Sequence, residues 1–323
     1  MADRDVQAET TYSQMDNAGG HPADPPKARI AAGQPGLLER TPHIFFPAPA
    51  VVALLAIMVF PSFFNLYISL NEWFATSASP PEFVLFDNYI RLFMEDDVFP
   101  AAIAKTLYFT ALAVGAEMLL GLGIALVLHR EFRGQSLVRS AFMLPMMATP
   151  AAIALVWVLI YHPTLGVMNY LLSMLGISPQ EWLAKSYMVI PSLALVDIWQ
   201  YTPFVTMVLL AGLIAMPLEP FESAHIDGAG PWQVFWYITL PLLRPTLMVA
   251  ALFRIIDSLK VFDTIFVMTQ GGPGRASETL NLYAFRTAFE YFHVGYAASI
   301  SLTLIVLVFV VSAAILRAGR GQL

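Results

Sequence analysis

Six long stretches of mostly apolar residues run through this chain. A helix needs about 20 such residues to cross the hydrocarbon core of a bilayer, and each stretch is long enough. They cover about 45–70, 105–128, 140–161, 187–215, 243–269 and 295–316. The runs are too long and alternate too little for strands of a membrane barrel. The sequence therefore predicts an all-α integral membrane protein with six transmembrane helices.

The composition agrees with a membrane protein. Of the 323 residues, 58% are hydrophobic and only 12% are charged. Soluble domains carry about 25% charged residues, so this chain lacks the polar surface of a soluble protein. The absence of cysteine excludes disulfides, thiol catalysis and cysteine-based zinc sites. No basic run indicates nucleic acid, and we expect no metal site.

The N-terminal residues 1–40 differ from the rest of the chain. They are polar and rich in Pro, Gly and Ala, and little in them can bury a core. They also lack the basic start followed by an apolar run that marks a signal peptide. We expect a disordered cytoplasmic tail over 1–40 and one transmembrane domain over 41–323.

Lys and Arg residues predict the orientation, because cytoplasmic loops are enriched in them. A cytoplasmic N-terminus leaves the larger share of these residues inside, although part of that share lies in the tail. The loop HREFRGQSLVR, residues 129–139, is the clearer signal. We therefore expect both termini, and the loop between the fourth and fifth segments, on the cytoplasmic side.

That second loop, about 217–245, is more ordered than a simple connector requires. A short amphipathic helix is followed by a break at Gly228 and Pro231, because glycine permits positive φ and proline fixes φ. A second, aromatic-rich segment follows, and Pro241 and Pro245 mark where we expect the chain to turn into the fifth segment. Such an element can dock into a groove on another protein. It can also be an interfacial connector whose aromatic rings lie at the headgroups.

Charged residues recur every three positions in the fifth segment: Arg254, Asp257, Lys260 and Asp263. Charge inside a membrane is costly and usually faces a cavity or a partner. The spacing lets Arg254 pair with Asp257, and Lys260 with either acid. These residues, with the ring of Phe262, can line a substrate pathway, or they can form a neutralised network that only holds helices together.

The fourth segment offers a second candidate lining in Asp197, Trp199, Gln200 and Tyr201. Rings and hydrogen-bonding groups of this kind suit a sugar, and a nearby proline frees a backbone carbonyl that a polar cavity tolerates. A plain helix–helix contact explains them equally well. Glu117 stands alone in the second segment, and the sequence gives it no role.

The order Glu222-Ser223-Ala224-x-x-Asp227-Gly228-Ala229, an aromatic stretch, then Leu-Pro-x-x-x-Pro resembles the signature loop of binding-protein-dependent ABC importer permeases. The family has Glu-Ala-Ala where this chain has Glu-Ser-Ala. The stretches 127–157, 199–224 and 261–300 also resemble carbohydrate permeases of the maltose type, in the first of their two permease halves. One departure is Lys105 before Thr106, where relatives often carry Asn.

The resemblance implies the type I ABC importer permease fold, with the loop as its cytoplasmic coupling helix. The positions that would contact a cytoplasmic ATPase are Glu222, Ser223, Ala224, Asp227, Gly228 and Ala229. Among these, Glu222 is the expected contact and Gly228 the turn between two short helices. Asp227 either caps the second short helix or has a purely structural role.

The resemblance also implies partners and a location. The partners are a second permease in a heterodimer, two ATPase subunits that hold ATP and Mg, an external solute-binding protein and a carbohydrate substrate. The location is a bacterial cytoplasmic membrane. The chain lacks a phosphate-binding glycine-rich loop and is not expected to be an enzyme. Two alternatives explain the loop poorly: a secondary transporter driven by an ion gradient, which predicts inverted repeats, and a membrane enzyme, which needs convergent catalytic residues.

Overall fold

A computed structural model describes residues 47–320, so the predicted tail over 1–40 lies outside the described residues. The chain divides within its first described helix into two units, Met1–Phe60 and Pro61–Leu323. The described part of the first unit contributes only the beginning of that helix, α4 (Ala48–Ser69). All other elements belong to the second unit.

Five helices within the described residues are long and apolar enough to cross a membrane. They are α4, α6 (Val98–His129), α11 (Val189–Ile214), a continuous helix over Pro231–Leu259, and α17 (Val294–Arg320). The other helices are α5 (Asp87–Met94), α7 (Gln135–Phe142), α8 (Leu144–Met147), α9 (Pro150–Ile160), α10 (Val167–Met174), α12 (Glu219–Ile226), α15 (Asp263–Met268) and α16 (Leu280–Phe289). The predicted helical membrane fold is confirmed, and it also contains a small hairpin of β1 (Asn71–Glu72) and β2 (Glu82–Phe83).

The third apolar segment departs from the prediction of one helix over 140–161. It consists of α7, α8 and α9, and α9 is a single apolar helix of 11 residues. Prolines explain the breaks, since Pro145 and Pro150 each stand at the start of a new helix. Proline has no N–H to continue a preceding helix and drives the residue before it to an extended conformation. Thr149, with ψ of 142°, has that conformation.

The fifth segment is also different from its prediction. The helix begins at Pro231 and continues through α13 (Pro231–Val234), a π-helical turn η1 (Phe235–Thr239) and α14 (Leu240–Leu259). The expected turn at Pro241 and Pro245 is therefore wrong. Pro241 lies in the first turn of α14, directly after the π turn, where the regular hydrogen-bond ladder is already interrupted.

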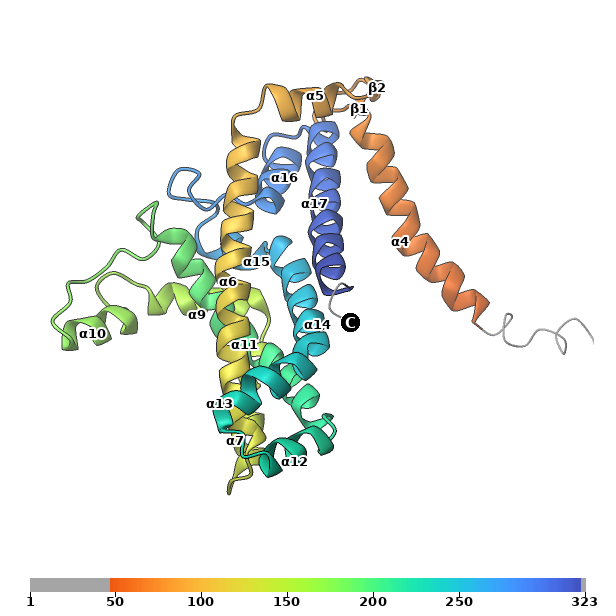
Figure 1. Ribbon diagram of the computed structural model, residues 1–323. Helices are drawn as coiled ribbons and strands as arrows, with labels where there is room; N and C mark the ends of the chain where they lie inside the picture. The colour runs from red at the N-terminus through yellow and green to blue at the C-terminus, as the bar shows by residue number, and fades with distance from the viewer. Residues whose placement is uncertain (1–46, 321–323) are drawn as a thin grey trace, which may run out of the picture. The chain divides into compact units, whose positions relative to one another are not determined.

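At its other end this helix stops at Leu259 rather than near residue 269. Lys260 is the C-cap residue, and Asp263 begins the separate helix α15. The two charges predicted to lie on the fifth membrane helix are thus at its end and beyond it. Figure 1 shows α15 as a short helix between α14 and α16.

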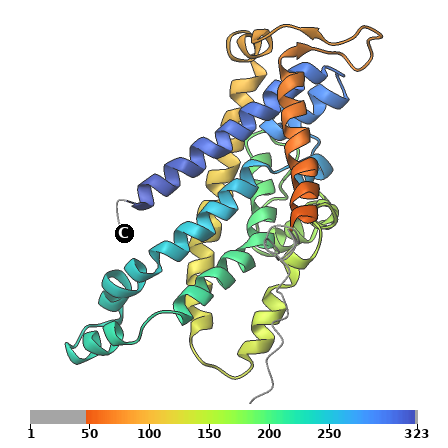
Figure 2. The same ribbon diagram turned by 90° about the vertical axis from the view of Figure 1, so that its right-hand side faces the viewer.

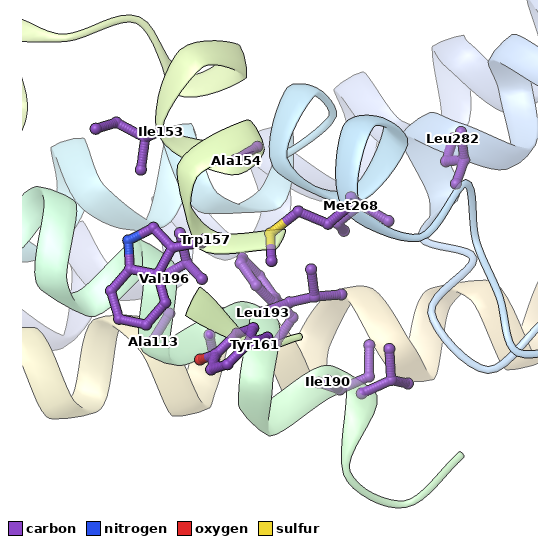
Figure 3. Packing of buried hydrophobic residues seen from close by; sticks show 14 residues of the cluster. Ala113, Ile153, Ala154, Trp157, Tyr161, Ile190, Leu193, Val196, Met268 and Leu282 are labelled. Carbon is purple, nitrogen blue, oxygen red and sulfur yellow. The ribbon is translucent and has the colours of Figure 1, made fainter. Parts of the chain in front are cut away.

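Buried apolar side chains bring α9, α11 and α15 together. Trp157 of α9, Leu193 and Val196 of α11, and Met268 of α15 belong to one buried cluster, as Figure 3 shows. Figures 1 and 2 show α6 as a long helix with α7 and α12 near its C-terminal end and α5 near its start. Packing around α6 and α11 fixes the positions from which polar side chains reach the interior.

Close contact between α6 and α11 depends on a glycine. A Cβ atom added at Gly121 would lie 2.7 Å from Cγ1 of Val205, whereas one added at Gly123 meets nothing within 4 Å. The two glycines lie on the same helix, but Gly121 faces α11 and Gly123 faces open space in the described chain. Only Gly121 is required for the packing.

We expect Gly121→Val to lower the stability of the purified chain by about 1–3 kcal/mol, because an overpacked helix interface must separate. Gly123→Val is the matched control, since it changes helix propensity equally but points into open space. Thermal unfolding in detergent measures both variants. Equal losses in the two variants would show that propensity, not packing, sets the effect.

At the end of the molecule that carries the hairpin, Asp96 ties two distant helices to the start of α6. Its Oδ2 accepts hydrogen bonds of 2.5 Å from the hydroxyls of Tyr283 and Tyr296. Burial acts to raise the pKa of Asp96, but these two bonds and two from backbone N–H groups outweigh it and lower the pKa. The ionised carboxylate is therefore the stable form in this network.

His293 stands beside this network in an apolar stack. Its ring lies 4.1 Å from that of Phe74 and 5.4 Å from that of Tyr296. Its Nε2 is buried without a hydrogen bond to any residue that the structure describes, and is 4.0 Å from a Glu72 oxygen, which is too far for one. Burial, followed by the positive charge of Arg91, lowers the pKa of His293 against the opposing effect of Glu72.

Because the pKa of His293 is lower in the folded chain, the folded state binds fewer protons than the unfolded state near pH 6. The contribution of the neutral His293 side chain to the stability of the fold is full above about pH 6.5 and is lost as pH falls through the folded pKa. His293→Phe keeps the stack and removes the titration. We expect thermal unfolding scans between pH 7.5 and 5 to show a smaller loss of stability in this variant, and an unchanged slope would assign the loss to other groups.

Candidate substrate cavity and coupling segment

One buried guanidinium group joins three helices of the second unit. Arg254 of α14 donates from Nε and Nη2 to the two oxygens of Glu117 on α6, at 2.7 and 3.0 Å. Its Nη2 also donates to Asp197 of α11 at 2.8 Å, and its Nη1 donates to Asp257 at 2.6 Å. We call these four residues the Arg254 cluster. It is the feature around which the other polar residues are arranged.

Four hydrogen bonds engage all three guanidinium nitrogens, and one of the five N–H groups, on Nη1, has no acceptor among the described residues. The Arg254, Glu117 and Asp197 side chains are 3%, 0% and 5% exposed. Burial of a charge in an apolar environment is tolerated only when the charge is paired and hydrogen-bonded. The predicted pair of Arg254 with Asp257 is present, and the larger part of the cluster crosses between helices.

The cluster reaches a cavity through two of its acids. The Asp257 side chain is 57% exposed, in contrast to the other three members. The Arg254 guanidinium also lies 4.0 Å from the ring centroid of Tyr201, a cation–π contact that holds the phenol at the same place. The buried charge thus fixes Asp257, Asp197 and Tyr201 along one wall.

This cavity has a volume of about 260 Å³ and is polar in part. Its lining consists of Pro150, Asp197, Tyr201, Asp257, Ser258, Lys260, Val261, Phe262, Asp263 and Thr264. Six of these, Asp197, Tyr201, Asp257, Lys260, Phe262 and Asp263, are among the pathway residues that the sequence suggests. We call this space the ion-pair cavity.

Three of the suggested pathway residues do not line this cavity: Arg254, which lies within its cluster, Trp199 and Gln200. Trp199 is 45% exposed and packs edge-on against Trp157, with ring centroids 5.7 Å apart. Gln200 is buried, and its Nε2 donates to the carbonyl of Ala148 at 3.2 Å. Neither lines the ion-pair cavity, because successive residues of a helix point in directions about 100° apart.

The pairing of Lys260 with Asp257 or Asp263 is not found within the described residues. Lys260 is exposed, and its ammonium forms no ion pair there. The helix ends at Leu259, so the expected i, i+3 register is lost at this point. Lys260 and Asp263 nevertheless both line the cavity, from the turn that joins α14 to α15.

Sequence reasoning missed Glu117 as a member of the site. Its partner lies 137 positions away, a separation that no local spacing reveals. The available signal was a single acid in an apolar helix, which demands a partner in the membrane interior. Lys105, which also had no assigned role, donates from Nζ to the carbonyl of Arg275 at 2.7 Å.

Residues 219–229, which we call the coupling segment, form the predicted short helix and glycine turn. Gly228 has φ of +74°. The N–H of Gly228 donates to the carbonyl of His225, and that of Ala229 donates to the carbonyl of Ala224. These two bonds form a Schellman motif, whose left-handed position favours glycine. The turn directs the chain from α12 into the continuous helix at Pro231.

Exposure within the coupling segment is uneven. Glu222, Ser223, Asp227 and Gly228 are exposed, whereas Ala224 is 8% exposed and faces inward. The expectation that Asp227 caps the second short helix is wrong. Gly230 is the N-cap residue of that helix, and its N–H donates to the side chain of Gln233 at 2.8 Å. Asp227 is instead the C-cap residue of α12, and its carboxylate makes no hydrogen bond within the described chain.

Residues 117–319 match the family model described as binding-protein-dependent transport system inner membrane component. The chain belongs to this family. The match includes the whole Arg254 cluster and the coupling segment. The family assignment favours an importer permease over a secondary transporter, and it agrees with a transport subunit that is not an enzyme.

Similar proteins extend the match toward the N-terminus. The "Probable ABC transporter permease protein y4oQ" of Sinorhizobium fredii is 38% identical over 92% of this chain and 96% of the relative. The "Trehalose/maltose transport system permease protein MalF" of Thermococcus litoralis is 35% identical over 84% of this chain and 91% of the relative. A chain of a bacterial ABC transporter involved in the import of the acidic polysaccharide alginate has the same fold, with a TM-score of 0.75 and 22% identity over 88% of this chain and 96% of that chain.

We expect Arg254→Gln to destabilise this permease by about 3–5 kcal/mol, because it leaves two buried carboxylates without their cation. The double variant Arg254→Gln with Glu117→Gln removes one of those carboxylates and recovers part of the loss. Lys260→Gln is the matched control, since Lys260 is exposed. Thermal unfolding and the yield of monodisperse protein measure all three. A stable Arg254→Gln variant would contradict a structural role for the cluster.

Proposed function

We propose that the chain is the membrane-spanning permease subunit of an ATP-driven importer of a carbohydrate: a sugar, a polyol or a sugar derivative. It forms half of the translocation pathway and works by alternating access. The observation that carries this proposal is the ion-pair cavity, which combines carboxylates and an aromatic face in a chain of this family. The relative whose name specifies trehalose and maltose supports the substrate class.

The chemistry of the cavity suits a sugar. Carboxylates of Asp257 and Asp263 accept hydrogen bonds from hydroxyl groups, and the Lys260 ammonium donates them. The ring of Phe262 offers an apolar face for the C–H face of a sugar ring. Arg254 remains bound within its cluster and holds this wall in place, so its role is positioning rather than substrate contact.

The continuous helix supplies a mechanical route from the coupling segment to the cavity. It begins at Pro231, three residues after the Gly228 turn, and Arg254 lies near its far end. At 1.5 Å per residue, Pro231 and Arg254 are about 35 Å apart along the axis. A tilt imposed on the start of this helix, next to the Gly228 turn, therefore moves the cluster without an intervening loop, and the cluster passes the movement to α6 and α11.

The proposed assembly contains a second, related permease, two cytoplasmic ATPase subunits and an external solute-binding protein. ATP and Mg are bound by the ATPase subunits, and this chain holds no cofactor or metal. Glu222, Ser223, Ala224, Asp227, Gly228 and Ala229 form the contact with the ATPase, with both termini in the cytoplasm of a bacterium. The exposed carboxylate of Glu222 on α12 supports that contact.

We expect Glu222→Arg to abolish binding of the ATPase and uptake of sugar while the permease still reaches the membrane, because the variant reverses a charge in the contact. Tagged chain is isolated from native membranes in mild detergent, and its partners are identified by mass spectrometry. Glu181→Arg, in an exposed segment before α11, is the matched control and retains the ATPase. Full ATPase recovery with Glu222→Arg would refute the coupling assignment.

A further inference from the structure

A second cavity lies next to the ion-pair cavity and shares a residue with it. It has a volume of about 410 Å³, and Phe262 lines both spaces. Its walls come from α16, α17 and the end of α4 that belongs to the same unit. The residues that matter here are Asn65, Phe262, Asn281, Phe285, Phe289 and Ser301. We call this space the aromatic groove.

Aromatic rings form a continuous wall along the groove. The ring centroids of Phe262 and Phe285 are 5.0 Å apart, and those of Phe285 and Phe289 are also 5.0 Å apart. Phe266 supports the first two from behind, at 5.2 Å from each. Phe289 is 66% exposed, so the wall extends from the open surface to the mouth of the ion-pair cavity.

Three polar side chains with unused hydrogen-bonding groups line the same space. Asn281 donates its Nδ2 to the carbonyl of Lys260 at 2.7 Å, which leaves its Oδ1 available as an acceptor. The Asn65 amide and the Ser301 hydroxyl form no hydrogen bond within residues 47–320 and line the groove. As far as the structure describes the chain, this lining carries no ionisable side chain, in contrast to the ion-pair cavity.

This combination selects a type of ligand. An aromatic wall binds the C–H face of a sugar ring, and amide and hydroxyl groups bind its hydroxyls without a net charge. The volume lies within the range of small-molecule sites. An ionic ligand would find no counter-charge among the described residues of the lining.

The geometry points to a second carbohydrate subsite in the aromatic groove, which binds one neutral pyranose ring and passes it along the wall to Phe262. This inference rests on the proposed function and deepens it. Phe262 is the shared contact, so a ring that leaves Phe285 can stack on Phe262 without returning to bulk water. The groove is thus a binding site that precedes the ion-pair cavity on the translocation pathway.

The lack of cysteine in this chain provides a direct test. In the complex purified with its partners, Ala288→Cys places a single thiol in the groove and Val261→Cys places one in the ion-pair cavity. Labelling by N-ethylmaleimide is followed by mass spectrometry of this chain, with maltose, trehalose, glucose and mannitol as probes. Leu165→Cys, at an 86% exposed position, is the control that no sugar protects.

A sugar that protects Val261→Cys is expected to slow labelling of Ala288→Cys by about twofold when its concentration equals its Kd for the groove, because half of the chains are then occupied. Protection of Val261→Cys alone overturns the subsite and leaves the proposed function standing. Protection at neither position by any of the sugars overturns the ion-pair cavity as a carbohydrate site, and the subsite with it.

A second pair of variants isolates the aromatic wall. In the Ala288→Cys background, Phe285→Leu keeps an apolar side chain but removes the ring, whereas Phe285→Tyr keeps the ring. We expect the first to lose protection and the second to retain it. As a control for folding, Phe285→Leu is also made in the Val261→Cys background, where protection by the sugar shows that the fold is intact. Full protection of Ala288→Cys in its own Phe285→Leu variant overturns the role of the ring.

Discussion

The buried guanidinium of Arg254 is the constraint on which the interior of this permease depends. A charge with 3% of its side chain exposed requires partners on every donor nitrogen, and it finds them on three helices at 2.6–3.0 Å. Because Glu117, Asp197 and Arg254 are far apart in sequence, the cluster fixes the relative register of α6, α11 and α14. The close approach at Gly121 serves the same contact between α6 and α11.

The cluster also connects a long continuous helix to the wall of the ion-pair cavity, so that movement of the helix can move the wall. The helix over Pro231–Leu259 has Arg254 near one end and the Gly228 turn next to the other. Its π turn at Phe235–Thr239 and its prolines interrupt the backbone ladder near the coupling segment and leave the stretch after Pro245 regular. The irregular backbone thus lies at the end of the helix near the coupling segment, and the regular backbone at the end near the cavity.

The helical membrane fold could be predicted because length and hydropathy decide it, and the glycine turn at Gly228 because its φ of +74° favours glycine. Helix ends were harder to predict. Pro145 and Pro150 broke the third segment. Pro241 did not break the fifth, since the interruption at η1 directly before it already removes the regular bonding, and Pro245 lies inside α14 without ending it. Local spacing found the pair of Arg254 with Asp257. It missed Glu117, because contacts between helices follow tertiary packing rather than periodicity.

The distribution of charge between the two cavities bears on substrate choice. Arg254 is bound within its cluster by four hydrogen bonds, and the ion-pair cavity presents the acids Asp197, Asp257 and Asp263 against the single unpaired cation Lys260, counted over its described lining. An anionic sugar would meet more negative than positive charge there, after crossing a groove whose lining offers no counter-charge at all. Within the proposed function, the side chains of this permease therefore favour an uncharged ring. The shared fold with an importer of an acidic polysaccharide does not determine charge preference, because the fold sets the path and the side chains that line it set the selectivity.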